Sequence, residues 1–217
     1  SSVNRGEIDP DEAAYYQAAG ICPAGQINYI DDRYANLDKR TVSGHDLGVY
    51  YSIKTDYGRF KIDYNASFLD KFEQQAGGLA TQLVEAQESG LLPANYPVMG
   101  FADLVRRNGN QKEKHSLRFM WRGDVFGATL SGYRIGSFYQ SELTLEDGTR
   151  YNIPAMTTFD ATVDYKVQIE SVDTRFRLGI KNLTDERAPL AASSFGFFED
   201  AHRDYGRYFY MDVRASF

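Results

Sequence analysis

The final stretch of the chain, Gly206 to Phe217, alternates between apolar and polar side chains without interruption. The apolar positions are Phe209, Met211, Val213, Ala215 and Phe217, and the polar positions are Tyr208, Tyr210, Asp212, Arg214 and Ser216. A period of two residues predicts a β-strand with one apolar and one polar face. Because full charges occupy the middle of the polar face, the strand suits a sheet that meets lipid on one side and a wet lumen on the other.

Six earlier segments repeat this alternation, so the sequence predicts seven antiparallel strands. The six are residues 46–54, 59–68, 116–122, 126–135, 158–169 and 175–181. The alternation shifts by one residue at Gly44 and again near Gly132, and each shift predicts a β-bulge. The charged residues of the polar faces are expected to pair across strands, and they include Arg118, Asp160, Asp164, Arg175, Arg177, Asp212 and Arg214.

The connections between these strands alternate in length. Tight turns are predicted at Thr55–Gly58, Gly123–Asp124 and Glu170–Asp173. Long loops are predicted near residues 76–112, 145–155 and 184–205, and the first of them contains a short helix at Gln82–Glu88. Short turns at one end of the strands and long loops at the other are typical of outer-membrane barrels.

These patterns together predict an all-β chain: an antiparallel transmembrane β-barrel segment of about seven strands, with long extracellular loops and short periplasmic turns. Residues 1–38 are expected to form an extracellular loop and the start of the first strand, and residues 39–217 the barrel portion. The last strand then runs toward the short-turn side, which leaves the C-terminus periplasmic.

Composition does not contradict a barrel, although it would also suit other folds. Charged residues make up 25% of the 217 residues, the formal net charge is −6 and the mean hydropathy is −0.48. No apolar run approaches the roughly 18 residues that a membrane helix needs, but barrel strands are only half apolar. An aromatic content of 14% suits a barrel with interfacial girdles or a carbohydrate-binding β-sandwich. The acidic balance and the lack of a basic patch argue against a nucleic-acid partner.

Aromatic residues cluster next to the predicted tight turns and at the chain's end. Tyrosine and tryptophan prefer the membrane–water interface, where the ring is apolar and its polar edge can form a hydrogen bond. We therefore expect a periplasmic girdle made of Tyr57, Phe60, Trp121, Phe126, Phe176 and Phe217.

No pattern of catalytic or metal-ligating residues stands out, so no enzymatic activity, metal or cofactor is expected. His45, His115 and His202 lack the spacing of a metal site. The acidic pairs Asp31–Asp32 and Glu199–Asp200 fall in predicted exterior loops, where solvation accounts for them. The lone Cys22 is either an inert loop thiol or half of a disulfide whose partner precedes residue 1.

The long loops contain exposed aromatics next to arginines, which can stack on sugar rings or planar chelates and pair with carboxylates. These residues are the candidate substrate-binding set, and the alternative is that they pack loop against loop. They are Tyr96, Phe101, Arg106, Arg107, Phe195, Phe197, Phe198, His202 and Arg203.

Four segments in this order resemble the C-terminal part of TonB-dependent outer-membrane receptors, which are plugged barrels of 22 strands. The segments are Asn36 onward into Val42–Tyr51, Lys114–Trp121, Leu178–Arg187 and Gly206–Phe217. His45 departs from the family pattern, since a hydrophobic residue is more usual there. The resemblance implies a receptor in the outer membrane of a Gram-negative cell, which binds a scarce solute and imports it with energy relayed by TonB.

The family also carries an N-terminal plug, a TonB-contacting box and about fifteen more strands, and seven strands cannot close a barrel. We therefore expect this chain to be the C-terminal third of a receptor, either as a cleaved fragment or as one partner of a split protein. Its partners would be the rest of the receptor, the TonB complex through that part, outer-membrane lipid and an unidentified small solute. The lumenal charges would help to hold the plug.

Two other hypotheses remain open. The first is a soluble all-β module that binds a ligand or carbohydrate on a concave aromatic face. The second is an exported β-sheet hydrolase, which is weaker because no nucleophile and base are visible in the sequence.

Overall fold

The computed structural model of the protein describes residues 2–31, 39–93, 98 and 102–216. The chain divides into two compact units, Ser1–Leu37 and Asp38–Phe217. Both units contain antiparallel strands, and the described helices are α1 and α2. Among the described residues, neither helix has the length and apolarity that crossing a bilayer requires.

The first unit is a small hairpin that carries a helix. Strand β1 (Ser2–Arg5) pairs antiparallel with β2 (Ile27–Asp31), and α1 (Pro10–Ala18) lies between them in the sequence. Asp9 caps the helix by accepting a hydrogen bond from the Asp11 backbone N–H at 2.8 Å, and Pro10 occupies the first turn. The segment that the sequence presented as loop therefore has its own secondary structure, because an N-cap signal within it starts a helix.

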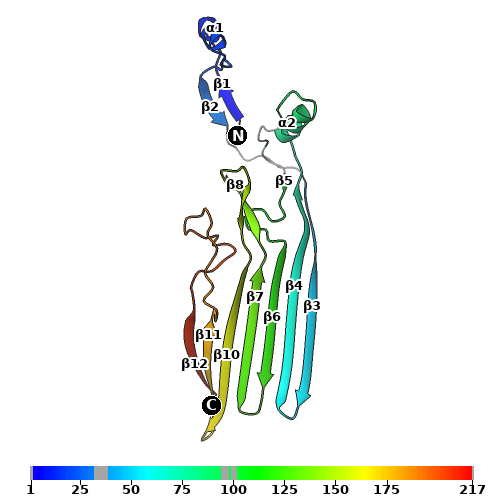
Figure 1. Ribbon diagram of the computed structural model, residues 1–217, viewed down its shortest axis with the longest axis vertical. Helices are drawn as coiled ribbons and strands as arrows, with labels where there is room; N and C mark the ends of the chain where they lie inside the picture. Colours follow the sequence, from blue (N-terminus) through cyan, green and yellow to red (C-terminus); the bar gives the residue numbers. More distant parts are fainter. Residues whose placement is uncertain (1, 32–38, 94–97, 99–101, 217) are drawn as a thin grey trace. The chain divides into compact units, whose positions relative to one another are not determined.

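The second unit contains the seven predicted strands as one antiparallel sheet in which chain neighbours are also sheet neighbours (Figure 1). The strands are β3 (Arg40–Thr55), β4 (Gly58–Gln74), β6 (Glu113–Arg122), β7 (Phe126–Ile135), β10 (Met156–Ile169), β11 (Val172–Lys181) and β12 (Tyr208–Ser216). Every predicted strand is confirmed, since the alternation of apolar and polar residues marks each of them.

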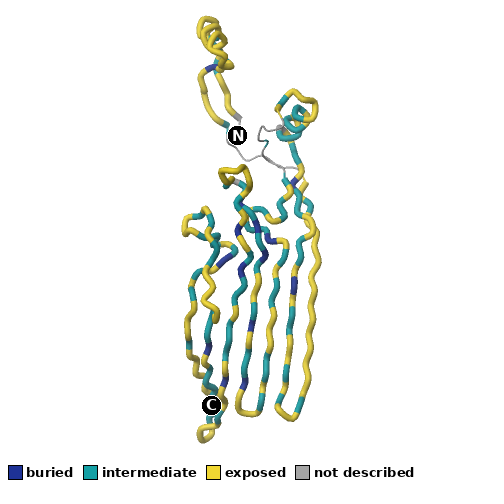
Figure 2. The backbone as a smooth tube through the Cα atoms, viewed as in Figure 1, coloured by how far each residue is buried: buried dark blue, intermediate teal, exposed yellow. Residues whose placement is uncertain are grey.

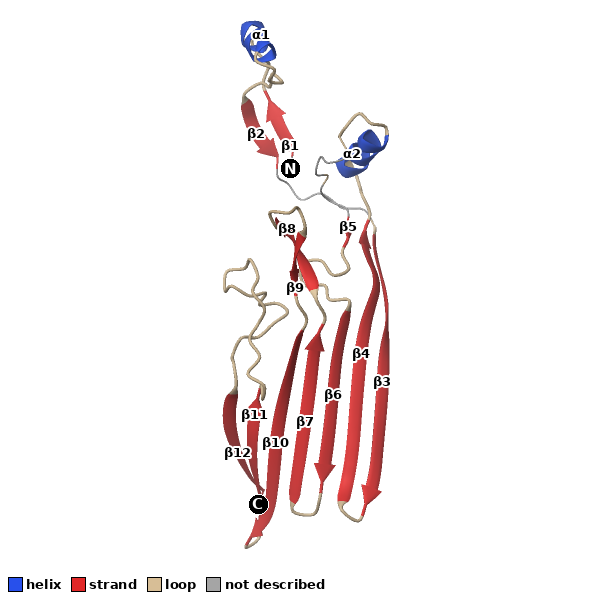
Figure 3. Ribbon diagram, viewed as in Figure 1, coloured by secondary structure: helices blue, strands red, loops and turns tan. Residues whose placement is uncertain are grey.

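Short turns join the strands in pairs at one end of the sheet, as predicted (Figure 3). Only Asp56 and Tyr57 separate β3 from β4, and Gly58 adopts the left-handed φ of 115°. The β6–β7 turn is closed by the Gly123 N–H, which donates to the Phe126 carbonyl at 2.9 Å. The β10–β11 turn has Glu170 at a φ of 56°. Gly58 and Glu170 thus supply the left-handed conformations that many tight turns use, and the β6–β7 turn is closed by its hydrogen bond.

The longer connections at the other end contain elements of their own. Helix α2 (Leu79–Glu88) includes the helix predicted at Gln82–Glu88, and β5 (Ala102–Asp103) pairs with β4. The predicted loop at 145–155 is wrong in extent, because the connection starts at Gly136 and forms a separate hairpin. Its strands are β8 (Phe138–Thr144) and β9 (Arg150–Ile153), and they pair antiparallel.

One of the two predicted bulges is confirmed. The β3–β4 register shifts between Ser43 and Gly44, so that Asp70 becomes an extra residue on β4. A Cβ at Gly44 would lie 2.3 Å from the Phe68 carbonyl oxygen, which explains why glycine occupies this position. The extra residue contacts the partner strand, since the Asp70 carboxylate lies 2.8 Å from His45 Nδ1 on β3.

The bulge predicted near Gly132 is wrong. Strand β7 keeps an unbroken register with both neighbours, with Gly132 opposite Leu117 and Phe159. The Phe159 ring fills the space above the glycine, 3.0 Å from where a Cβ would lie. The apolar–polar alternation of β7 is interrupted at Gly132 because Phe159 of β10 supplies the apolar side chain at this position. Tyr133 stays on the polar face.

The close approach at the bulge gives a test of the fold. Gly44→Ala should lower the free energy of unfolding by about 1–3 kcal/mol, because the methyl group must displace the backbone of β4. Urea unfolding followed by the fluorescence of Trp121, the one tryptophan, would measure this loss. Ser43→Ala, which adds no atom at the neighbouring position, should change the midpoint much less. Equal effects of the two substitutions would contradict the close contact.

Candidate functional site

The seven-stranded sheet has two faces of opposite character, because residues directly opposite each other on paired strands share a face. One face, called here the apolar face, carries large apolar side chains that remain exposed on every strand. They are Leu47, Val49, Tyr51, Ile53, Ile62, Leu117, Phe119, Phe126, Leu130, Phe159, Val163, Tyr165, Leu178, Phe209, Met211 and Val213. In Figure 2, exposed and intermediate residues dominate these strands.

The apolar face is too large to be an ordinary exposed patch. Seven strands at a spacing of about 4.8 Å extend across about 29 Å, and the stretch from Leu47 to Ile53 covers about 20 Å along β3. Soluble monomers rarely expose contiguous apolar patches beyond a few hundred Å², and larger ones mark surfaces that bind protein or membrane.

The opposite face, called here the polar face, contains the paired charges. Asp164 is 4% exposed and accepts hydrogen bonds from Arg175 Nε at 2.9 Å and Arg177 Nε at 2.8 Å. Nearby, Lys181 Nζ donates to the Asp160 carboxylate at 2.6 Å. The predicted cross-strand pairs are thus confirmed for these residues. The arrangement is inverted relative to a water-soluble sheet, since buried charge lies on one face and exposed apolar groups on the other.

Aromatic residues border the apolar face at its short-turn end, where the sequence predicted a girdle. Phe60 lies opposite Trp121, and Trp121 Nε1 donates to the Tyr57 carbonyl at 2.8 Å. Phe126 lies opposite Tyr165, with ring centroids 5.1 Å apart. Each ring thus meets the edge of the apolar face. Tyr165 in turn faces Phe176 on β11, whereas Phe217 lies outside the described residues.

At the long-loop end, the segment 104–111 and the β8–β9 hairpin are joined by a polar network. The Arg106 guanidinium donates to Ser137 Oγ at 2.9 Å and to Asn152 Oδ1 at 3.2 Å. Arg107 forms a parallel bridge with Tyr139. Two of the candidate binding arginines therefore hold one loop to another in this structure.

The segment 188–202 packs against the same hairpin and completes what we call the loop layer, made of residues 104–111, β8–β9 and 188–202. The Gln140 side chain accepts from the Ala192 N–H at 2.8 Å and donates to the Ala192 carbonyl at 3.1 Å. Phe138 is fully buried and contacts the Phe198 and His202 rings, at centroid distances of 5.1 and 5.6 Å. The loop layer thus has a small core of its own.

His202 lies inside that core. It is 1% exposed, stacks on Phe138 with an interplanar angle of 14°, and neither ring nitrogen has a hydrogen-bond partner among the described residues. Burial lowers the pKa of the imidazole below its usual value of 6.5, because the charged form would lose its hydration. The neutral ring therefore packs as an aromatic residue.

The other candidate binding residues are placed differently. Phe195 is 72% exposed, with its ring 6.3 Å from that of Phe197, and Arg203 is exposed and donates to the Glu199 carbonyl at 3.1 Å. Tyr96 and Phe101 lie outside the described residues. A solute could reach Phe195 and Arg203 directly, whereas it could reach the His202 ring only if the loop layer opened.

The sequence reasoning did not identify Phe138, Gln140 or Ile153, which form the centre of the loop layer. A signal for them exists. Phe138 and Gln140 begin an alternating stretch, and Asp147–Gly148 supplies a turn in which Gly148 has a φ of 82°.

No metal centre is found: in the part of the chain that the structure describes, no group of three or more His, Cys, Asp and Glu side chains could hold an ion. The histidines lie in different settings, since His115 Nδ1 is 2.9 Å from the Tyr64 hydroxyl and His45 lies beside Asp70. In the first unit, Cys22 is a free, exposed thiol.

No protein-family model, no curated protein and no solved structure matches the chain. The resemblance to TonB-dependent receptors therefore stays a prediction from the sequence. Function has to be inferred from the two faces of the sheet and from the loop layer.

The buried histidine predicts that acid loosens the loop layer. In the unfolded segment the His202 imidazole binds a proton near pH 6.5, whereas in the folded core its pKa is lower. The loop layer therefore loses stability as the pH drops below 6.5. Hydrogen exchange of residues 188–202 should accelerate several-fold between about pH 7.5 and about pH 5.5, after correction for intrinsic rates. His202→Phe should abolish the dependence, and His45→Gln, at an exposed histidine, should preserve it. A response that survives in His202→Phe would exclude this cause.

An ion pair in the same connection, between Arg187 and Asp204, predicts a further loss of stability at lower pH. The Asp204 carboxylate accepts from Arg187 Nε at 2.8 Å and from the Ala188 N–H at 2.9 Å, and these bonds lower its pKa to about 2. Its stabilisation is complete above the ordinary pKa of 3.8 and is lost as the pH falls toward 2.

The corresponding measurement follows the exchange of the Ala188 amide in the His202→Phe background. Protection should hold at pH 4 and above and decline below it. Asp204→Asn should weaken protection at neutral pH already, whereas Asp200→Asn, at an exposed carboxylate, should not. Unchanged protection in Asp204→Asn would show that the pair contributes nothing.

Proposed function

We propose that the second unit is a wall segment of an outer-membrane β-barrel and that the barrel belongs to a TonB-dependent receptor. The observation that carries the proposal is the inverted sheet, with exposed Val163, Leu178 and Met211 on one face and buried Asp164 on the other. A barrel wall needs this arrangement, because its outer face meets hydrocarbon and its inner face meets water. The layout of short turns opposite long connections supports the same reading.

The open edges of the sheet support the need for further strands. Within the described residues, β3 pairs only with β4, and β12 pairs only with β11. An unpaired strand edge is not tolerated in the hydrocarbon region, and about eight strands are the minimum for a closed barrel. Strands outside this chain would therefore pair with β3 and β12, and the plug and the TonB contact would belong to that remaining part.

The proposed mechanism is capture of a scarce solute by the extracellular loops, followed by its passage through the barrel with energy relayed by TonB. No covalent chemistry is involved. Phe195 and Arg203 are the exposed candidates for first contact, and the compact loop layer would hold them in place. Arg106 and His202 would act indirectly, by fixing the shape of the layer.

The alternative is a soluble β-module that binds a ligand or carbohydrate. Such a module would have to cover the apolar face with a second layer, since β-sandwiches bury the inner faces of two sheets against each other. Among the described residues no second layer lies on this face. Behaviour without detergent separates the two proposals, because a soluble module would stay monodisperse and a barrel wall would aggregate.

Neighbouring residues on β10 give a sharper test. Val163 lies on the apolar face and Thr162 on the polar face, so Val163→Arg would place a charge in lipid and Thr162→Arg would not. The expected cost of Val163→Arg is about 2–4 kcal/mol if the site lies near the bilayer midplane. Refolding into lipid vesicles, scored by flotation and by urea midpoint, measures the difference.

The experiment should use the chain with whatever partner chain co-purifies with it. Val163→Leu serves as a control for substitution at the same position. Insertion that is equally efficient for Val163→Arg and Thr162→Arg would rule out a lipid-facing Val163. Monodisperse behaviour of the wild-type chain without detergent or partner would rule out the barrel altogether.

A further inference from the structure

Basic side chains collect on the polar face near the short turns, and we call this set the basic band. Its members are Lys54, Arg59, Lys61, Arg122, Lys166, Arg175 and Arg214. The register places like charges directly opposite one another in two rows. Lys54 faces Arg59, which faces Arg122, and Lys166 faces Arg175, which faces Arg214. Like charges in such positions destabilise a sheet unless an anion bridges them.

The acidic residues of the chain do not neutralise the first row. Within the described residues, no ion pair involves Lys54, Arg59 or Lys61. Arg122 lies 3.8 Å from Asp164, whose carboxylate is already bound by the β11 arginines. The other acids on this part of the face are Asp63, opposite Arg118, and Asp212, opposite Arg177. Further acids lie at or near the turns: Asp56, Asp124, Glu170 and Asp173.

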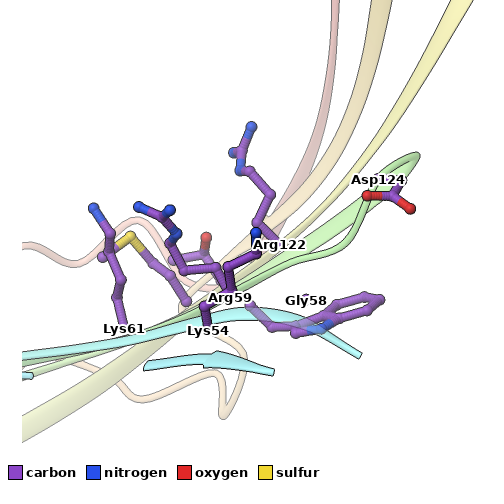
Figure 4. Close-up of a pocket in the computed structure, with 9 residues that line it drawn as sticks. Lys54, Gly58, Arg59, Lys61, Arg122 and Asp124 are labelled. Atoms are coloured by element: carbon purple, nitrogen blue, oxygen red, sulfur yellow. The ribbon is translucent and has the colours of Figure 1, made fainter. Parts of the chain in front are cut away.

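The first row also lines a cavity of about 500 Å³ together with Met120, Trp121 and Thr129. Figure 4 shows the Arg59, Lys61 and Arg122 side chains projecting to the same side of the sheet. The cationic groups therefore converge on one open space, where they are available to a ligand.

We propose that the basic band is a docking surface for an acidic polypeptide segment. The first row lies on β3, β4 and β6, and the second lies on β10–β12, between Asp164 and the short turn, with Arg175 also bound to Asp164. Together the rows extend across about 29 Å of sheet. One phosphate ion can bridge only neighbouring strands, so it would leave most of the band uncompensated. An extended peptide carries side chains on one face about every 6.7 Å, so a segment with alternating acidic residues sets about four carboxylates along this length. The inference does not depend on what covers the apolar face.

The test uses the full chain in detergent micelles and a fluorescein-labelled Glu-Ser repeat peptide of about ten residues. We expect binding by anisotropy that weakens at least about tenfold between about 50 and about 300 mM NaCl, because the charges are solvent-exposed. The matched Gln-Ser and Lys-Ser peptides should not bind. Inorganic phosphate and a single-stranded oligonucleotide of equal charge serve as competitors.

The double variant Arg59→Gln, Lys61→Gln should weaken the acidic peptide at least about tenfold. The control Lys112→Gln, Lys114→Gln removes the same charge at the long-loop end of β6 and should leave binding within about twofold. Without peptide at low salt, Arg59→Gln should raise the urea midpoint, since it relieves repulsion. A lowered midpoint, an equal loss in the control pair, or displacement by millimolar phosphate or by the oligonucleotide would each overturn the proposal. These readouts concern the polar face only, so their failure is distinguishable from a failure of vesicle insertion.

Discussion

The hydrogen-bond register of the seven-stranded sheet is the constraint on which every surface of this protein depends. Side chains alternate along a strand, so a shift of one residue would move Val163 to the polar face and Asp164 to the apolar face. The register is continuous from β6 to β12, and the shift at Gly44 is confined to the long-loop end of β3–β4. At the other end, the tight turns set the pairing of the strands, and the rows of the basic band lie within a few residues of these turns.

Because of this register, the sheet buries a charged group and leaves most of its large apolar side chains exposed. Burying a large apolar side chain typically contributes about 1.5–3 kcal/mol, yet most such residues of the sheet are exposed on the apolar face. The sheet instead buries the Asp164 carboxylate, whose desolvation is offset by charge-assisted hydrogen bonds from Arg175 and Arg177. Such a sheet gains its hydrophobic stabilisation from the medium or partner that covers the apolar face, and lipid is the medium we propose.

The sequence predicted the strands well, because each alternates with a period of two and the pattern is local. It also located the bulge at Gly44 and the short turns. It failed at Gly132, where the Phe159 ring on another strand supplies the apolar group, and it missed the β8–β9 hairpin. In the loop layer it named Arg106 and His202 but could not assign their roles, since these depend on contacts with Ser137 and Phe138 from a different loop.

The basic band is another feature that depends on pairing between strands and so could not be predicted from local sequence. The chain has a net charge of −6 and no basic run, so a cationic surface could not be expected from the order of its residues. The rows exist because pairing places single basic residues of β3, β4 and β6 side by side, as it does again for β10, β11 and β12. Net charge therefore describes this protein poorly. One end of its polar face concentrates positive charge, and the long-loop end holds the aromatic and arginine residues that can meet a solute.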